Sequence, residues 1–272
     1  MPRFSANIST LFREYLMIER IAEAASAGFD AIEIQFPYAE QPGALRAALD
    51  SHRLPLALMN FPAGDLMQGG EGLAAVPGRE AEFEAALVEA REFAEILRPR
   101  GMNLLAGRPG PEHDPALCDA VFKKNLAKAY ALTSQLGIRL LTEPVNTVDL
   151  PGFFLQDAPQ ALALIEALPG IELSMQYDLY HMRMMGAELL TQLPAVIDRV
   201  GHIQFSDLPG RTEPGRGSID FKACFDLIDA LGYAGYVGAE YFPTVATSAS
   251  LDWLEPYRTG HSGTRPSPKA PC

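Results

Sequence analysis

Four side chains that can offer an oxygen atom each follow a short apolar run. They are Glu143 in LLTEPVN, Asp178 in LSMQYDLYHM, Gln204 in GHIQFSD and Glu240 in YVGAEYFP. A carboxylate placed among buried residues is costly unless it is paired or bound to a metal. Three carboxylates and one amide form an oxygen-only set, which suits Mg²⁺ or Mn²⁺ better than zinc. We therefore expect these residues to hold one divalent metal ion.

The spacing of the four residues indicates a shared site. The intervals between them are 35, 26 and 36 residues, whereas one strand–helix unit of a barrel of about 250 residues takes roughly 31. The four residues would then stand at four successive strand ends, and neighbouring strands lie about 4.8 Å apart. Any one of them could instead pair with an arginine or cap the next helix. All four in register favour the metal site.

Other polar residues lie close to these positions in the sequence. His181, three residues after Asp178, could donate a hydrogen bond to a substrate oxygen or could face solvent at a helix start. His202 should share a strand face with Gln204, one layer deeper, where it could position its neighbours. Arg211 and Glu213 fall in the loop SDLPGRTEPGRGSID. We expect both to contact substrate, with Arg211 gripping a carboxylate, although Arg211 could equally be a solvated loop charge.

These residues need a scaffold of short β-rich runs that alternate with longer helical segments. Such alternation predicts a parallel sheet covered by helices. The expected strands are Arg3–Ile8, Ala31–Phe36, Pro55–Phe61, Met102–Ala106, Arg139–Pro144, Glu172–Asp178, His202–Ser206 and Tyr236–Tyr241.

Eight such units without a break in composition predict a single (β/α)8 TIM barrel over residues 1–258, followed by a flexible tail at 259–272. A doubly wound open sheet is less well supported, because no glycine-rich phosphate loop follows the first strand. One connection, residues 62–79, is unusually long, and it could either cover the site or be a plain surface excursion.

Composition excludes several classes of protein. Of the 272 residues, 48% are hydrophobic and 21% are charged, with a net charge of −12. Such a surface disfavours nucleic acid and anionic membranes as partners. Three scattered cysteines without a CxxC pair argue against disulfides and zinc–thiolate sites. Together with the lack of a signal-peptide-like start, this leads us to expect a cytoplasmic protein. A homo-oligomer is possible.

The chain contains the motif RFSANIS at its start and the motifs FPAGD, PGRE, EPVN, QYDLYHM, HIQFSD, EPGRG and GAEY further along. Together these motifs resemble the hydroxypyruvate isomerase family of xylose-isomerase-like barrels. The resemblance extends from Pro2 to about Arg258 and is also close to the 2-oxo-tetronate isomerases. The family implies a metal held by the residues that match Glu143, Asp178, Gln204 and Glu240. It also implies that the two glutamates are the catalytic acid and base.

The expected reaction interconverts hydroxypyruvate and tartronate semialdehyde, a pair of small hydroxy-keto acid isomers, through an enediolate. The alternatives are a 2-oxo-tetronate isomerase or a ketose 3-epimerase of the same superfamily. A non-catalytic sugar-acid binding protein is a weaker alternative, because it would not need both Glu143 and Glu240. A metal-dependent endonuclease would need more histidines and a basic face for DNA.

Overall fold

The computed structural model describes residues 1–258 as one closed barrel of eight parallel strands, paired in the order β1 to β8 and then back to β1. The strands are β1 Arg3–Asn7, β2 Ala31–Ile34, β3 Leu56–Asn60, β4 Gly101–Asn103, β5 Arg139–Thr142, β6 Leu173–Asp178, β7 Val200–Phe205 and β8 Tyr236–Ala239. The (β/α)8 barrel expected from the sequence is therefore confirmed. The tail expected at 259–272 lies outside the described residues.

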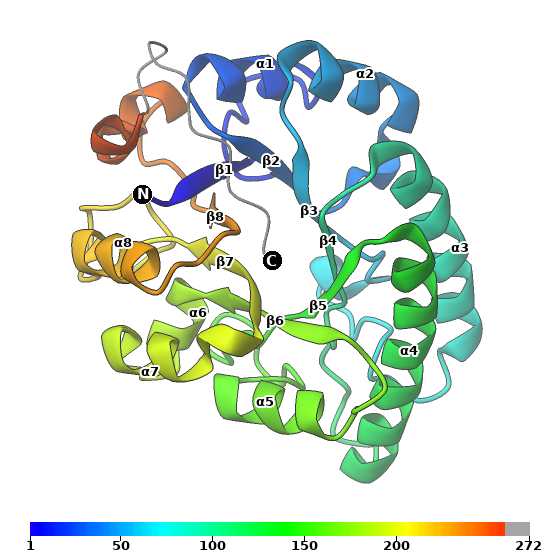
Figure 1. Ribbon diagram of the computed structural model, residues 1–272. Coiled ribbons are helices and arrows are strands. Elements are labelled where there is room, and N and C mark those ends of the chain that lie inside the picture. The colour runs from blue at the N-terminus through cyan, green and yellow to red at the C-terminus, as the bar shows by residue number, and fades with distance from the viewer. Residues whose placement is uncertain (259–272) are drawn as a thin grey trace, which may run out of the picture.

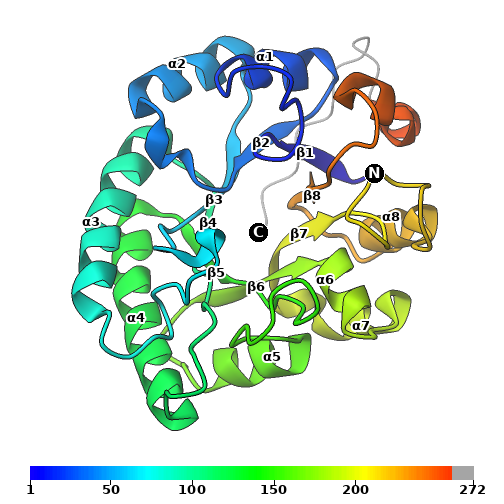
Figure 2. The same ribbon diagram turned by 180° about the vertical axis from the view of Figure 1, so that it is seen from behind.

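Helices surround the strands on all sides (Figure 1 and Figure 2). The α-helices are α1 Glu19–Ser26, α2 Pro42–His52, α3 Glu80–Leu97, α4 Pro115–Leu136, α5 Ala158–Glu166, α6 Leu179–Met184, α7 Leu189–Val196 and α8 Phe221–Ala230. Short 3-10 turns complete the ring: η1 Pro37–Ala39, η2 Leu66–Gln68, η3 Ile197–Arg199, η4 Thr247–Ser250 and η5 Asp252–Tyr257. No helix within residues 1–258 combines the length and the apolar character that crossing a membrane requires.

The hydrophobic core lies between the outer face of the barrel and the helices. Phe4 of β1 packs edge to face on Phe225 of α8 and on Trp253 and Tyr257 of η5, and Phe205 of β7 joins the same group. Each aromatic pair contributes about 0.5–1.5 kcal/mol beyond the area it buries. η5 thus covers the seam where the first and last strands meet.

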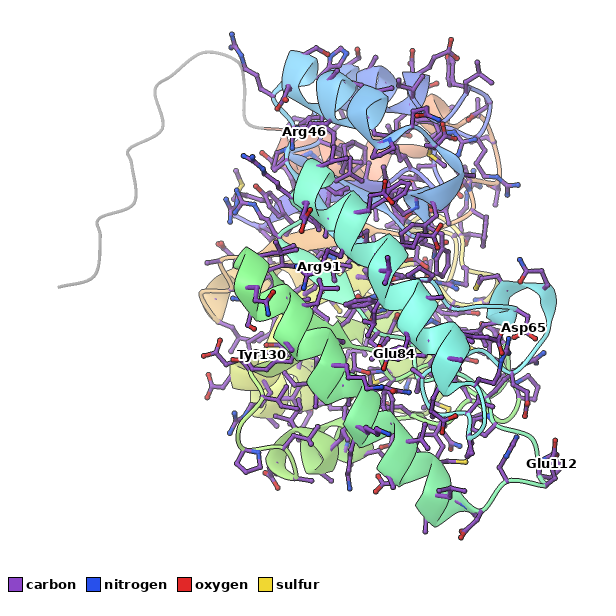
Figure 3. The ribbon with its side chains drawn as sticks, turned by 90° about the vertical axis from the view of Figure 1, so that its right-hand side faces the viewer. Arg46, Asp65, Glu84, Arg91, Glu112 and Tyr130 are labelled. Carbon is purple, nitrogen blue, oxygen red and sulfur yellow. The ribbon has the colours of Figure 1, made fainter. Side chains whose placement is uncertain are left out.

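The two longest helices, α3 and α4, run side by side along one flank (Figure 3). Lys128 of α4 forms an ion pair with Glu84 of α3, and Arg91 donates to Gln135 at 3.0 Å. Asp65 and Glu112 both lie on the right-hand side of this view. They belong to the loops that follow β3 and β4, so this side carries the carboxyl ends of the strands.

The fourth strand is shorter than the sequence predicts. β4 ends at Asn103. Leu104 still donates to the Leu141 carbonyl of β5, but the Ala106 carbonyl accepts from Ala75 of the long loop 62–79 instead of from a strand. Residues 73–76 of that loop are buried. Arg79, the last residue of the loop, fixes the loop further because it donates to the Asp65 side chain and to the Gly72 carbonyl. The loop is therefore an anchored wall of the barrel mouth, and its closure over the site stays a prediction.

Candidate active site

The interior of this barrel is polar, whereas the interior of a TIM barrel is usually filled with branched apolar side chains. The polar and charged side chains buried on the strands or directly after them include Ser5, Asn7, Glu33, Asn60, Asn103, Glu143, Gln176, Asp178, His202, Gln204 and Glu240. Hydrogen bonds between distant strands link many of them, as described below. Polar side chains do not contribute to a hydrophobic core, so their presence inside the barrel indicates a catalytic or binding role.

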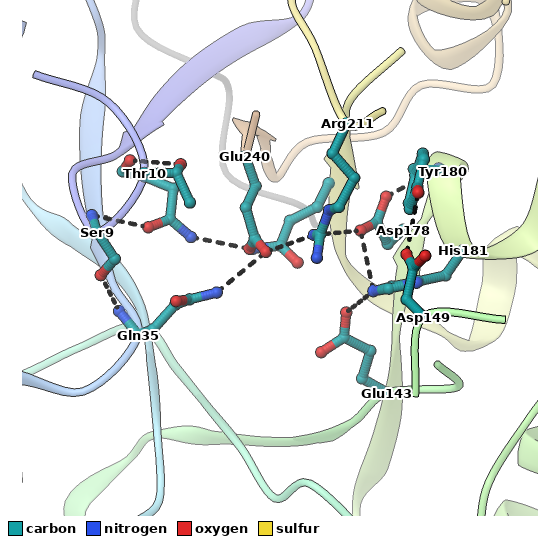
Figure 4. A network of polar contacts seen from close by, with 12 residues as sticks. Ser9, Thr10, Gln35, Glu143, Asp149, Asp178, Tyr180, His181, Arg211 and Glu240 are labelled. Atoms are coloured by element: carbon teal, nitrogen blue, oxygen red, sulfur yellow. Dashed lines mark hydrogen bonds and ion pairs between the residues drawn. The ribbon is translucent and has the colours of Figure 1, made fainter. Parts of the chain in front are cut away.

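The register of the strands brings the four expected ligands to one level. Asp178 of β6 pairs with Gln204 of β7, which in turn pairs with Gly238 of β8. Glu143 and Glu240 directly follow β5 and β8. Figure 4 shows Glu143, Asp178 and Glu240 around one space, with the guanidinium of Arg211 between the last two. Active sites of TIM barrels lie at this carboxyl end.

Glu240 is the most strongly held of these carboxylates. Its Oε2 accepts from Asn7 Nδ2 at 2.8 Å and from Gln204 Nε2 at 2.6 Å. Its Oε1 accepts from Gln35 Nε2 at 3.0 Å and from Arg211 Nη2 at 2.6 Å. Burial raises the pKa of Glu240 to about 7, while the charge of Arg211 works against this rise. A carboxyl group with a pKa near 7 can both take up and release a proton at neutral pH.

Glu143 and Asp178 are equally buried but have fewer partners. Glu143 Oε2 accepts from Asn103 Nδ2 at 2.9 Å, and burial together with the charges of Glu240 and Asp178 raises its pKa well above the usual range. Asp178 caps α6 by accepting from the Tyr180 backbone N–H at 2.9 Å. Burial also raises the pKa of Asp178, although Arg211 opposes the shift. Asp178 therefore does cap the helix that follows it, which was the alternative to metal binding. This cap uses only one of its two carboxylate oxygens.

The donor set suits a divalent cation. If ionised, Glu143, Asp178 and Glu240 bring three buried negative charges, and within residues 1–258 Arg211 is the one charged cationic side chain in ion-pair distance of them. His181 lies nearby, but burial lowers its pKa well below 6.5, so it is neutral at pH 7. A divalent ion would compensate the remaining two charges. Ligand atoms of Glu143, Asp178 and His181 lie within 4.8 Å of one another, close enough to share an ion.

Gln204 is at the centre of the cluster with its nitrogen toward the carboxylates. Nε2 donates to Glu240 Oε2 and to Glu33 Oε2, the latter at 2.8 Å, while Oε1 accepts from Gln176 Nε2 at 2.5 Å. Coordination of a metal by Gln204 uses Oε1, because an amide nitrogen has no free lone pair. Because a carbonyl oxygen has two lone pairs, Oε1 can accept from Gln176 with one and act as the expected ligand with the other.

The environment of His181 favours its expected role as a hydrogen-bond donor. Asn146 Oδ1 accepts from the backbone N–H groups of Val148 and Asp149, so its Nδ2 faces His181 Nδ1 at 2.7 Å. Nδ1 must therefore accept, and the ring proton lies on Nε2. Nε2 is 3.6 Å from Asp178 Oδ2 and 3.9 Å from Glu143 Oε1. An N–H at this place can donate to a substrate oxygen.

Arg211 and Glu213 have different surroundings although they lie two residues apart. The Arg211 guanidinium lies 5.2 Å from the centre of the Tyr180 ring, and its buried Nε has no partner among residues 1–258. A buried donor of this kind is available to a ligand. Glu213 instead accepts from the Thr244 backbone and hydroxyl and from Arg216. The structure thus brings Arg211 into the site, whereas Glu213 holds the loop.

Several residues of the site were missed in the sequence. Asn7, Gln35 and Asn103 orient the two glutamates from β1, from the residue after β2 and from β4. Glu33, in the middle of the buried strand AIEI, is fully buried. A charged residue inside an apolar strand was a usable signal for Glu33. The three amides carry no such signal, since isolated amides are common at strand ends.

A cavity of about 1100 Å³ lies at the opposite end of the barrel, where the strands begin. Arg3, Arg100 and Arg139 are among its lining residues. It shares no residue with the carboxylate cluster apart from His202, which lies between the two ends. Because the carboxylate cluster lies at the carboxyl ends of the strands, it is the candidate active site.

Comparisons with known proteins agree with this architecture. Residues 21–257 match the xylose isomerase-like TIM barrel family. The chain is 40% identical to a hydroxypyruvate isomerase of Escherichia coli (95% of this chain, 100% of the relative) and 39% identical to a 2-oxo-tetronate isomerase of Cupriavidus necator (94% and 99%). A crystal structure described as an AP endonuclease, family 2, from Brucella melitensis superimposes with a TM-score of 0.91 at 34% identity (95% and 100%).

More distant structures share the fold alone. An L-ribulose 3-epimerase superimposes with a TM-score of 0.74 at 22% identity, with 97% of this chain and 89% of that chain covered. In contrast, the matches to the hydroxypyruvate isomerase and the 2-oxo-tetronate isomerase cover nearly the whole chain. This chain is an isomerase that belongs to the xylose isomerase-like TIM barrel family and groups with its hydroxypyruvate and 2-oxo-tetronate isomerases.

Proposed function

We propose that the protein is a metal-dependent isomerase that interconverts hydroxypyruvate and tartronate semialdehyde. The observation that carries this proposal is the pair of buried glutamates, Glu143 and Glu240, each with a raised pKa, that share one space with Asp178 and Arg211. Proton transfer between adjacent carbons needs two groups of this kind. The names of the relatives supply the substrate class.

Glu143, Asp178 and Glu240 would hold a Mg²⁺ or Mn²⁺ ion, with Gln204 Oε1 as the expected fourth ligand. When bound, the cation supplies Lewis-acid stabilisation of the negative charge that develops on two neighbouring substrate oxygens. We assign the rest of the chemistry to side chains of the chain itself.

Arg211 would bind the substrate carboxylate through its unpartnered Nε, and His181 Nε2–H would donate to a substrate oxygen. One glutamate removes the proton from the hydroxyl-bearing carbon, which gives the enediolate. A proton is then delivered to the neighbouring carbon, the former carbonyl carbon. The hydroxyl oxygen of the first carbon gives up its proton and becomes the new carbonyl oxygen, while the former carbonyl oxygen takes up a proton and becomes the new hydroxyl group. The two glutamates exchange roles between the two directions of the reaction, so both need a pKa that allows either state.

A 2-oxo-tetronate substrate, one carbon longer, is the second candidate, because that relative is as similar to this chain as the hydroxypyruvate isomerase is. DNA cleavage, which the name AP endonuclease suggests for the Brucella protein, is not favoured here. A chain with a net charge of −12 and a site of buried carboxylates repels phosphate.

The test is incorporation of solvent deuterium into hydroxypyruvate and into a 2-oxo-tetronate, side by side, with EDTA, Mg²⁺ or Mn²⁺. We expect exchange and isomerisation that depend on the metal. Glu240→Gln should lower turnover by about 10²–10⁴-fold, the usual contribution of a general acid–base group. Activity that is unchanged by EDTA, or by both Glu240→Gln and Glu143→Gln, would refute the proposal.

A further inference from the structure

Glu33 is a buried carboxylate that the proposed reaction does not use. It stands on β2, where its side chain is fully buried beneath the residues that would meet the substrate. Ser5 Oγ and His202 Nε2 both donate to Oε1, the latter at 2.8 Å, and Gln204 Nε2 donates to Oε2 at 2.8 Å. Each oxygen of Glu33 therefore has its own set of donors.

Position 238 leaves room for this carboxylate. A Cβ atom on Gly238 of β8 would lie 2.0 Å from Glu33 Oε1, so any larger residue would displace the side chain. Gly238 pairs with Ser5 of β1 and with Gln204 of β7. Glu33 of β2 thus reaches past β1 and β8 to β7 through a gap that only glycine provides.

The contacts of Glu33 determine which way the Gln204 carboxamide points. A carboxylate accepts hydrogen bonds and donates none, so only the nitrogen end of Gln204 can face Glu33 Oε2. Nε2 also donates to Glu240, and the oxygen end is left on the other side, where Gln176 donates to it. The reversed orientation would place an amide oxygen against two carboxylates.

We propose that Glu33 is a positioning residue: it holds the nitrogen end of Gln204, so that the oxygen end, which accepts from Gln176 with one lone pair, offers its second lone pair to the cation. This inference rests on the proposed function, because the orientation of Gln204 matters for activity only if Gln204 binds the cation. Glu33 itself contacts neither substrate nor metal. Ser5 and His202 contribute by fixing Glu33, since they occupy its other oxygen and leave Oε2 for Gln204.

Glu33→Gln tests the idea because it should reverse Gln204. Ser5 and His202 both donate to the position of Oε1, so the new glutamine should keep its oxygen there and turn its NH₂ group toward Gln204. Gln204 can then face it only with its oxygen. Loss of a group that orients a metal ligand typically costs about 10–100-fold in metal affinity or activity. We expect that loss in Mn²⁺ affinity, measured by calorimetry, and in kcat.

The exchanged double variant, Glu33→Gln with Gln204→Glu, separates positioning from a merely structural role. It keeps the number of charges, and a carboxylate at position 204 offers oxygen in either orientation. We expect it to recover most of the Mn²⁺ affinity that Glu33→Gln alone loses. Ser5→Ala is a graded comparison: it removes one of the two donors to Glu33 Oε1 but leaves the contact between Glu33 and Gln204, so its loss of Mn²⁺ affinity should be smaller than that of Glu33→Gln.

A readout without metal keeps the inference distinct from the proposed function. The side-chain NH₂ signal of Gln204, identified by its absence in Gln204→Glu, should be protected from solvent exchange in the metal-free wild type and in Ser5→Ala. It should lose protection in Glu33→Gln. An unchanged signal, or a folded double variant that binds Mn²⁺ no better than Glu33→Gln, would overturn the positioning role. A wild type that neither binds Mn²⁺ nor isomerises substrate, with the NH₂ signals as expected, would refute the proposed function alone.

Discussion

The pH dependence of stability provides a sharp test of the buried carboxylate cluster. In the metal-free protein the pKa of Glu240 is about 7, whereas a glutamate in the unfolded chain titrates near 4.5. Between these values the folded protein keeps a proton that the unfolded chain has lost. The free energy of unfolding therefore falls as the pH rises through this interval.

The magnitude follows from the width of that interval. Each pH unit contributes about 1.4 kcal/mol, so ionisation of Glu240 should cost the folded state about 3 kcal/mol by pH 7. Glu240→Gln has no titratable group at this position. Its free energy of unfolding, measured relative to wild type, should therefore rise by about 3 kcal/mol between pH 4.5 and pH 7. The comparison with wild type cancels the effect of His181, whose lowered pKa acts in the opposite direction.

Urea titrations of both proteins in EDTA, at half-unit steps from pH 4.5 to 7.5, would measure this difference. Glu213→Gln is the control, because hydrogen bonds from Thr244 help to lower the pKa of Glu213. The stability of that variant relative to wild type should stay nearly constant across this range, because the lowered pKa of Glu213 affects stability mainly below pH 4.5. Mn²⁺ at about 100 times its Kd should stabilise the wild type by about 2.7 kcal/mol. A stability difference between Glu240→Gln and wild type that does not change with pH would contradict the reasoning.

Three further substitutions test other parts of the structure. Arg211→Lys keeps the charge but loses the unpartnered Nε donor, so KM for the acid substrate should rise about tenfold or more in steady-state assays; an unchanged KM would argue against carboxylate binding there. Asp207→Ala removes a buried carboxylate that accepts from the backbone N–H groups of four residues, 208, 215, 217 and 219. It should lower the free energy of unfolding by at least about 3 kcal/mol, which chemical denaturation would measure, and a loss below about 1 kcal/mol would show that the loop does not depend on it. Arg79→Ala releases the anchor on Asp65 and Gly72, so limited proteolysis should cut within 62–79 faster than in wild type; equal rates would show that the wall is held elsewhere.

The sequence was a good guide to the fold and to the level of the site. Alternating elements predicted the closed barrel, and regular intervals placed Glu143, Asp178, Gln204 and Glu240 at successive strand ends, where the structure has them. The end of β4 was wrong, because the loop at Ala75, distant in sequence, captures Ala106. Patterns along one strand do not report such contacts between distant segments.

The finer arrangement of the site depends on contacts that no spacing rule contains. Nothing in the sequence tells which end of the Gln204 carboxamide faces Glu240, because that depends on Glu33 from the far side of the barrel. The same holds for Glu213, which looks equivalent to Arg211 in sequence but bonds to Thr244. Metal ligation, the acid–base roles and the substrate contacts remain predictions that the experiments above address.

The polar interior of the barrel separates the forces that fold the chain from the groups that react. Hydrophobic stabilisation comes from the outer shell, where Phe4, Phe205, Phe225 and Trp253 pack between strands and helices. The inner shell contributes polar side chains, many of which form hydrogen bonds with one another. Substitutions inside the barrel that abolish activity should therefore leave a protein that still folds. The lining can change its substrate over evolutionary time while the outer shell keeps the scaffold intact.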